Sequence, residues 1–549
     1  MDHDPQRAAA HGAGGVRIPA DLRLSTVPEG PVMGVPAACG LLTRAELHIT
    51  EAYDMHALRD ALADGTHTAL DVVTAFGKRA AIAHQLTNCL ADWFLPEAQE
   101  HARWLDAEFQ RTGRPVGPLH GVPVSVKDQV CVAGRDASAG FLSTKAPAED
   151  DALLIRVLRE QGAVPFVKTT MAQAIMHLEC ESFHGRTCNP YNTHLSSGGS
   201  SGGEGALLAL HGSVLGIGTD IGGSIRVPAA FNGLYGYRPT AHVFSRLGVK
   251  GTMPGNRSIV GVVGPLAHSL RDCALFVDTA LPSQRQDSGV HPMAWPARAG
   301  VRGRRTRVGL MADDGVVHPH AAIQRALRWM RRVLADMPDM DIVEYVPPGG
   351  TRAWELATAL YFPDGGARVR ALGAAACEPL HPLTRWLLAQ DGVRERSMHV
   401  LWELHAEHAA FRQMFHEHWN ALGLDVVIAP VYVAPGAAQN TARYWNYSSL
   451  WNVLDYPGIA FPTGLFVEPE DGAERLRTAR NVAEDECIAS GALTANYTGI
   501  PLGLQMVAQT DDDARLFALM AAVDRAVGGG TGGGEARGGE AGSVPTPTT

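Results

Sequence analysis

The chain has 549 residues, of which 46% are hydrophobic and 19% are charged, and its 47 basic and 57 acidic residues leave a net charge of −10. This acidic balance argues against a broad surface for nucleic acid or for anionic membranes. The apolar content excludes disorder over most of the chain, and the length is ample for an enzyme with one large core.

Taken in chain order, the sequence predicts a disordered lead, an alternation of helices and strands, and a disordered tail. The lead covers residues 1–20 and the glycine-rich tail residues 528–549, which leaves 21–527 as one domain. Apolar residues recur at the helical period in 51–64, 96–110, 150–161 and 323–335, and short β-rich runs occupy 122–126, 164–167, 307–310 and 425–430. Continuous apolar runs beside helices are typical of buried strands in an α/β sheet. The predicted fold class is therefore α/β with a single large core.

Compartment signals in the sequence favour a cytoplasmic protein. The eight cysteines are scattered and none is spaced as C-x-x-C, which favours a reduced protein over a disulfide scaffold. The first five residues carry charge and proline where a secretory leader would carry a basic start and an apolar core. No run approaches the ~18 apolar residues of a membrane-spanning helix. We therefore expect no membrane insertion.

The most unusual stretch of the chain is 197–240, with 12 glycines in 44 residues. Composition alone is compatible with a flexible linker, but the apolar, helix-compatible run 206–210 between two glycine clusters argues against one. A phosphate cradle is also disfavoured, because no Gly-Lys-Ser/Thr closes the loop and 216–221 lacks the last glycine of a dinucleotide fingerprint. Glycines inside a packed region instead indicate tight turns and exposed backbone N–H groups.

Acyl transfer fits the second glycine cluster best. The N–H groups of Ile221, Gly222, Gly223 and Ser224 could converge on an oxyanion, since glycine lets the backbone approach a substrate carbonyl. Arg226 stands where a Gly-x-Ser-x-Gly elbow would have its last glycine, so a histidine triad is not implied. A serine nucleophile still needs a base to accept its proton.

Two segments together, 198–240 and Pro118–Asp128, resemble the amidase signature family, and within it fungal acetamidases and general amidases; fatty acid amide hydrolases are similar too. The similarity runs from about Cys39 to Val507. The resemblance implies a mixed β-sheet flanked by helices on both faces, and hydrolysis of a small-molecule carboxamide without cofactor or metal.

The resemblance also assigns roles to individual residues. Ser224 matches the nucleophile that forms an acyl-enzyme, Ser200 the bridging serine after a cis peptide bond, and Lys127 the base. Ile175, together with Gln173, matches a loop that lines the acyl pocket. The predicted substrate-binding residues are Ile221, Gly222, Gly223, Ser200 and Ile175.

Lysine can act as a base only when it is neutral, so burial must lower the pKa of Lys127 from ~10.4 towards the working pH. Asp128 beside it would oppose this by pairing with Lys127, unless strand alternation turns Asp128 away, which we expect. Met171 and Ala172 depart from the family pattern, and His177, Glu179 and Cys180 after them are expected to reshape the pocket. The aromatic group Tyr444, Trp445, Tyr447 and Trp451 suggests either a pocket wall or core.

Three alternatives stay open at the level of sequence. His405 and His408 have a spacing that could bind zinc, but no His-Glu-x-x-His motif forms and the helix 401–420 presents them near its solvated side, so we expect no metal. A glutamine-using amidotransferase subunit, and a non-catalytic binding protein on the same fold, are the competing functions. A homodimer is compatible with the sequence, and the amide substrate itself is not specified by it.

Overall fold

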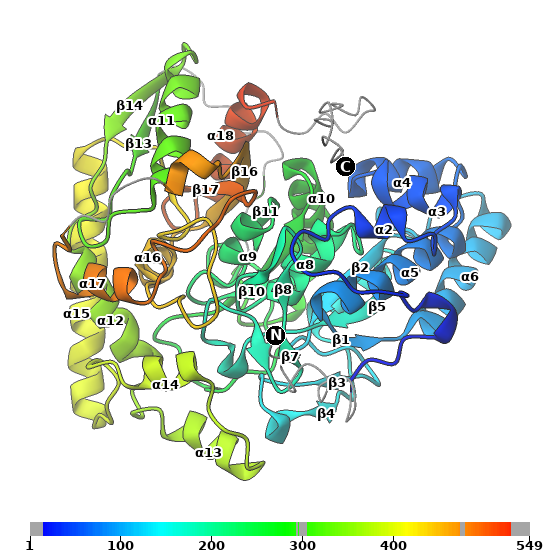
Figure 1. Ribbon diagram of the computed structural model, residues 1–549, viewed down its shortest axis with the longest axis horizontal. Helices are drawn as coiled ribbons and strands as arrows, with labels where there is room; N and C mark the ends of the chain where they lie inside the picture. The colour runs from blue at the N-terminus through cyan, green and yellow to red at the C-terminus, as the bar shows by residue number, and fades with distance from the viewer. Residues whose placement is uncertain (1–14, 292–294, 296–304, 473–477, 529–549) are drawn as a thin grey trace, which may run out of the picture.

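The computed structural model describes residues 15–291, 295, 305–472 and 478–528 (Figure 1). Most of the predicted lead and the predicted tail beyond residue 528 lie outside the described residues. The described strands form one large sheet and three two-stranded ribbons. Along the large sheet the order is β1 (Leu90–Trp93), β5 (Val164–Thr169), β2 (Pro123–Lys127), β10 (Leu215–Asp220), β12 (Val262–Ala267), β11 (Tyr235–Arg238), β16 (Gly458–Phe466), β17 (Pro501–Val507), β15 (Val426–Pro430), β13 (Thr306–Leu310) and β14 (Met340–Glu344). The ribbons pair β3 (Asp136–Ala137) with β4 (Ala146–Pro147), β6 (Glu181–Ser182) with β7 (Gly185–Arg186), and β8 (Cys188–Asn189) with β9 (Asn192–Ser196).

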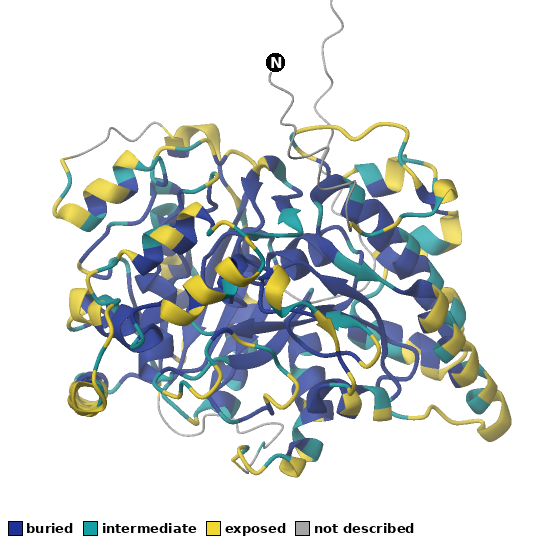
Figure 2. Cartoon of the chain, turned by 90° about the horizontal axis from the view of Figure 1, so that it is seen from below, coloured by how far each residue is buried: buried dark blue, intermediate teal, exposed yellow. Residues whose placement is uncertain are grey.

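Helices pack on both faces of this sheet, whose buried strands occupy the centre of Figure 2. The α-helices are α2 (Val35–Ala38), α3 (Arg44–Glu51), α4 (Met55–Ala63), α5 (Ala69–Thr87), α6 (Leu95–Thr112), α7 (Leu153–Glu160), α8 (Gly202–Ala209), α9 (Arg226–Phe231), α10 (Leu270–Ala280), α11 (Ala321–Ala335), α12 (Gly350–Tyr361), α13 (Ala367–Ala375), α14 (Pro382–Leu388), α15 (Met398–Ala421), α16 (Asn446–Leu454), α17 (Val482–Ala489) and α18 (Asp513–Ala526). Short 3-10 turns are η1 (Ala20–Leu22), η2 (Leu142–Thr144), η3 (Gln173–Ile175), η4 (Leu281–Gln286) and η5 (Pro469–Gly472). The predicted α/β class, with one large core and a mixed sheet, is confirmed.

The sheet is parallel in two places and antiparallel elsewhere. Strands β5, β2 and β10 run parallel to one another, and so do β14, β13 and β15. The strands between these two groups pair antiparallel. Every residue of β2, β5 and β10 is buried, as expected for strands covered on both faces.

Most predicted elements lie where the sequence placed them, with one difference of note. The predicted helix 51–64 begins four residues later than expected, because Glu51 is the last residue of α3 and α4 spans Met55–Ala63. Asp54 caps the second helix by accepting a hydrogen bond from the N–H of Ala57 (2.9 Å), and such a cap favours a new helix start.

The parallel strands β5, β2 and β10 end at one edge of the sheet. Lys127 closes β2 and pairs with Thr169, which closes β5, while β10 reaches Thr219 and Asp220 beside them. In sheets of this kind ligands bind outside the carboxyl ends of parallel strands. The glycine-rich segments therefore meet the predicted lysine at the edge where a site is expected.

Candidate active site

Lys127 lies wholly inside the protein, with 0% of its surface exposed. Its Nζ donates hydrogen bonds to Ser200 Oγ (2.7 Å) and to Thr219 Oγ1 (2.8 Å). Burial lowers the pKa of Lys127 from 10.5 to about 7, because an ammonium ion loses hydration there. A lysine of this pKa exists substantially as the neutral amine at neutral pH, in contact with the hydroxyl of Ser200.

The neighbouring aspartate does not pair with Lys127. Asp128 lies 3.7 Å from Lys168 Nζ, accepts a hydrogen bond from Ser138, and faces His184 at 3.6 Å. The prediction that strand alternation turns Asp128 away is confirmed. Two buried lysines thus stand on adjacent strands, but only Lys168 has a carboxylate partner.

A second polar pair, Thr219 and Gln129, orients the lysine, and sequence reasoning missed both residues. Gln129 Nε2 donates to the carbonyl oxygen of Lys250 (3.0 Å), so Gln129 Oε1 faces Thr219 and accepts its hydroxyl proton at 2.9 Å. Because the Thr219 hydroxyl is committed as a donor, its oxygen can only accept from Lys127 Nζ. A neutral Lys127 therefore donates one N–H to Thr219, and its lone pair can point to Ser200.

Glu204, on α8, adds a buried carboxyl group behind the lysine. It is 0% exposed and hydrogen-bonds to Ser125 Oγ (2.5 Å) and Thr169 Oγ1 (2.8 Å). Desolvation raises the pKa of Glu204 to about 8, so the group is largely protonated at neutral pH. The charge that Glu204 carries when ionised raises the pKa of Lys127, but this effect is smaller than the lowering by burial.

The first glycine cluster carries Ser200 on a tightly packed turn. The Gly199–Ser200 peptide bond is cis, the geometry that the resemblance implied. A side chain at position 199 would lie 2.6 Å from the carbonyl oxygen of His177, so only glycine fits there. The carbonyl oxygen of Ser200 accepts a hydrogen bond from Ala172 N–H (3.2 Å), which ties this turn to the loop after β5.

Ser201 connects the two glycine clusters. Its N–H donates to the carbonyl oxygen of Ser224 (3.2 Å), and its hydroxyl donates to the carbonyl oxygen of Thr219 (3.3 Å). The structure therefore brings Ser224, which is 3% exposed, beside the segment that carries Ser200. Lys127 and Ser200 are in side-chain contact, and the backbone of Ser224 lies next to that of Ser201.

The loop from Ile221 to Ser224 is held by the carboxylate of Asp220. Arg226 makes two hydrogen bonds of 3.0 Å to it, and Asn452 on α16 donates to it at 2.9 Å. Burial alone would raise the pKa of Asp220, but the Arg226 guanidinium holds it well below its usual range. Asp220 and Arg226 thus form a buried ion pair beneath the loop.

One member of the predicted oxyanion loop is already engaged. Gly223 N–H donates to Asp220 Oδ1 (2.8 Å), because the fixed carboxylate lies within reach of that amide. Within the described residues, the N–H groups of Ile221, Gly222 and Ser224 have no hydrogen-bond acceptor. The turn requires glycine at position 223, because its φ is +123° and a Cβ there would lie 2.3 Å from Ser448 Oγ.

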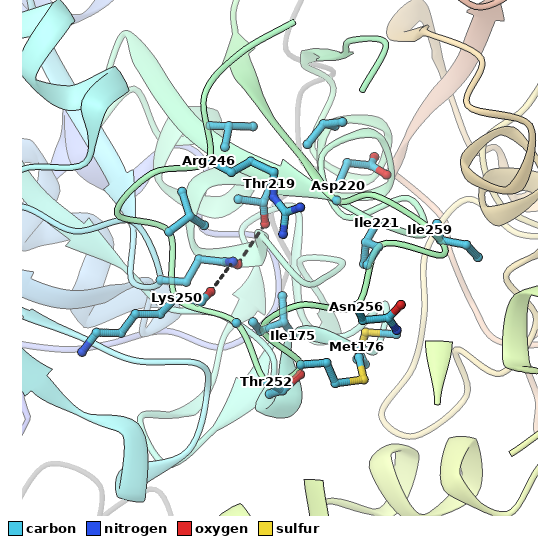
Figure 3. A pocket seen from close by; sticks show the side chains of 17 residues that line it. Ile175, Met176, Thr219, Asp220, Ile221, Arg246, Lys250, Thr252, Asn256 and Ile259 are labelled. Carbon is cyan, nitrogen blue, oxygen red and sulfur yellow. Dashed lines mark hydrogen bonds between the residues drawn. The ribbon is translucent and has the colours of Figure 1, made fainter. Parts of the chain in front are cut away.

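A pocket opens beside this loop (Figure 3). Its lining includes Thr219 and Ile221 from the edge that carries Lys127, and Ile175 from the loop after β5. That Ile175 binds substrate stays a prediction. Gln173 does not line it: its amide donates to Glu378 (2.9 Å) and accepts from the backbone of His381 (2.7 Å), which fastens the loop.

Other residues expected near the pocket lie elsewhere. The segment His177, Glu179 and Cys180 is buried and none of the three lines this pocket, so an effect on its shape stays a prediction. His177 stacks on His381 at 4.6 Å and packs behind the Ser200 turn. The four aromatic residues of 444–451 are buried, and they belong to the core and not to the pocket wall.

The histidines of α15 have other partners. His405 Nε2 hydrogen-bonds with Ser258 Oγ (2.9 Å), and His408 Nε2 with the carbonyl oxygen of Val453 (2.7 Å). In the described part of the chain, no group of three or more His, Cys, Asp or Glu residues is arranged to hold a metal ion. None of its helices is both long and apolar enough to cross a bilayer.

Comparison with known proteins agrees with this geometry. The amidase family model matches residues 71–517. Acetamidases from Aspergillus oryzae and Emericella nidulans are each 35% identical over 531 residues, covering 93% of this chain and 96% of their own. A solved structure of fatty acid amide hydrolase has a TM-score of 0.87 and 30% identity, covering 93% of this chain and 92% of that chain. The chain therefore belongs to the amidase signature family. Since its relatives include enzymes named amidase and acetamidase, the protein is an amidase.

Proposed function

We propose that the protein hydrolyses a carboxamide C–N bond through an acyl-enzyme, with Ser224 as nucleophile, Ser200 as bridge and Lys127 as base. The observation that carries this proposal is the 2.7 Å contact between Lys127 Nζ and Ser200 Oγ at a site where burial lowers the pKa of the lysine to about 7. A base whose pKa lies near the working pH combines adequate basicity with a large neutral fraction.

The first step moves one proton along two hydroxyl groups. Ser224 Oγ attacks the carbonyl carbon of the amide while its proton passes to Ser200 Oγ, and the proton of Ser200 passes to the lone pair of Lys127 Nζ. Lys127 donates one N–H to Thr219, whose own hydroxyl proton goes to Gln129, so the lone pair of Lys127 can face Ser200. The result is a tetrahedral oxyanion on Ser224 and an ammonium on Lys127.

Backbone donors stabilise the oxyanion. The N–H groups of Ile221, Gly222 and Ser224 are the members of the loop without an internal acceptor, and each donor aimed at a developing negative charge is worth about 3–4 kcal/mol in comparable sites. Tyr361 and Ser448 bind the carbonyl oxygens of Ile221 (2.5 Å) and Gly222 (2.7 Å), which orients these peptide groups before substrate arrives.

Collapse of the tetrahedral intermediate completes acylation. The C–N bond breaks, and the leaving nitrogen takes the proton back from Lys127 through Ser200, so that ammonia or an amine departs. Water then attacks the acyl-Ser224 ester, the same relay accepts its proton, and the carboxylic acid leaves with Ser224 restored. Every proton is returned, and each step uses groups that the chain itself supplies.

The test is turnover of primary amides by Ser224→Ala and Lys127→Ala variants, measured as ammonia release. We expect both to lose turnover by about 10³-fold or more, while circular dichroism shows the wild-type fold. Fluorophosphonate should label wild type at Ser224, identified by peptide mass mapping.

Ser25→Ala is the matched control, since it removes an exposed serine hydroxyl outside the site. A folded Ser224→Ala variant with wild-type turnover would refute the proposal. Ammonia release only in the presence of a co-purifying second subunit and glutamine would favour the amidotransferase alternative.

A further inference from the structure

Among the charged residues that line the pocket beside the oxyanion loop, one side chain has no hydrogen-bond or ion-pair partner in the described part of the chain. Of its 17 lining residues, the charged ones are Asp220, Lys250 and Arg246. The Asp220 carboxylate accepts hydrogen bonds from Arg226 and Asn452. The Lys250 ammonium donates to backbone carbonyl oxygens of the 137–146 segment and points away from the cavity in Figure 3. Arg246 is thus the unmatched ion among the described lining residues.

The Arg246 side chain stands exposed at the mouth of the pocket, and Figure 3 shows its guanidinium directed over the cavity. Partial desolvation lowers the pKa of Arg246, and the positive charge of Arg257 lowers it further; no carboxylate of the described residues offsets them. Two guanidinium groups near one opening repel each other. An anion bound there would relieve that repulsion, on a chain whose net charge is −10.

The cavity that Arg246 lines is also lined by residues of the reacting end, and most of its other lining is apolar. Ile221 belongs to the oxyanion loop, and Thr219 contacts Lys127 directly, so the carboxamide lies at their side of the pocket. The remaining lining is mainly aliphatic or thioether in character and includes Ile175, Met176, Val249, Met253 and Ile259. A ligand that fits both parts has an apolar stem with an anionic end.

We propose that Arg246 selects amides whose acyl part ends in a carboxylate, that is, monoamides of dicarboxylic acids. The inference rests on the proposed amide hydrolysis and adds the substrate class. The carboxylate binds the Arg246 guanidinium by a charge-assisted, bidentate pair, and the aliphatic stem lies along the apolar wall. The carbonyl carbon is then held beside Ser224.

The experiment compares matched amides with and without the charge. Succinamate is set against 4-methylpentanamide, in which an isopropyl group replaces the carboxylate, and the one-carbon-longer pair is measured as well. Ammonia release gives kcat/KM for wild type, for Arg246→Gln, and for Arg103→Gln. Arg103 is exposed on α6 and does not line the pocket, so its loss removes the same charge from another surface.

We expect wild type to prefer the carboxylate member of at least one pair by about tenfold or more, roughly the value of one charge-assisted contact. Arg246→Gln should lose that preference through KM and keep its kcat/KM for the neutral amide within about twofold, whereas Arg103→Gln should behave as wild type. Added salt should raise KM for the anionic amide only, because an exposed charge is screened.

Equal or better hydrolysis of the neutral amides by wild type, or an equal loss for both amides in Arg246→Gln, would overturn the inference while leaving the amidase proposal intact. Failure to hydrolyse any amide overturns the proposed function instead. The two failures are therefore distinguishable in the same set of assays.

Discussion

The pH dependence of acylation tests the chemistry most directly, since it follows the protonation of Lys127. With the pKa of Lys127 at about 7, the neutral fraction rises from about 9% at about pH 6 to about 91% at about pH 8. The rate constant kcat/KM should therefore rise about tenfold over that interval and gain only about 10% above it. The sign follows from the role of the group: a base is active when deprotonated, so activity falls as pH falls.

An ordinary lysine would give a different curve. With a pKa of ~10.4, kcat/KM would rise about a hundredfold between about pH 6 and about pH 8 and about 70-fold more by about pH 10. The assay is ammonia release at low concentrations of a neutral primary amide, because kcat/KM then reports the free enzyme. A neutral amide is preferred since its own ionisation does not enter the profile.

The variant Thr219→Val tests whether the rise of kcat/KM with pH, the limb of the profile, reports the protonation of Lys127. Valine keeps the shape of threonine but removes the oxygen that accepts a hydrogen bond from Lys127 Nζ at 2.8 Å. Losing that acceptor destabilises the ammonium form, so the limb should move to lower pH. A limb that stays in place in Thr219→Val, or a wild-type rate that keeps climbing tenfold per unit up to about pH 10, would refute the reasoning.

Two further predictions concern residues around the relay. Gln129→Leu removes the oxygen that accepts the Thr219 hydroxyl proton at 2.9 Å, so that proton can turn to the Lys127 lone pair. We expect kcat to fall about tenfold with KM unchanged. An unchanged kcat would contradict the orienting role of Gln129. Gly223→Ala would put a Cβ 2.3 Å from Ser448 Oγ at a φ of +123°, so activity should fall by about 100-fold and the unfolding free energy by about 1–3 kcal/mol. The unfolding free energy is measured by urea denaturation. The control is Gly251→Ala, where an added Cβ meets nothing within 4 Å.

The proposed relay could be derived from the sequence because its three residues lie in short, unusual segments. Lys127 ends an apolar run, and both serines follow paired glycines, so local pattern and family resemblance point to the same residues. The strands were predictable for a related reason: runs buried on both faces are continuously apolar.

What could not be predicted depends on contacts between distant segments. Gln129 and Thr219 are 90 positions apart, and their order of donor and acceptor follows from a third contact, to the backbone of Lys250. The engagement of Gly223 depends on where Arg226 holds Asp220. Arg246 belongs to no motif, and its place at the pocket is visible only in three dimensions.

The oxyanion loop has a consequence for how the enzyme is made. Its peptide groups are oriented by Ser448, and its anchoring carboxylate by Asn452, both on α16, whereas Ser224 precedes them by more than 200 residues. A nascent chain of 300 residues would already carry the base, the bridge and the nucleophile, yet lack the helix that aims the loop. The loop can therefore reach the arrangement described only after residues 446–454 have been synthesised.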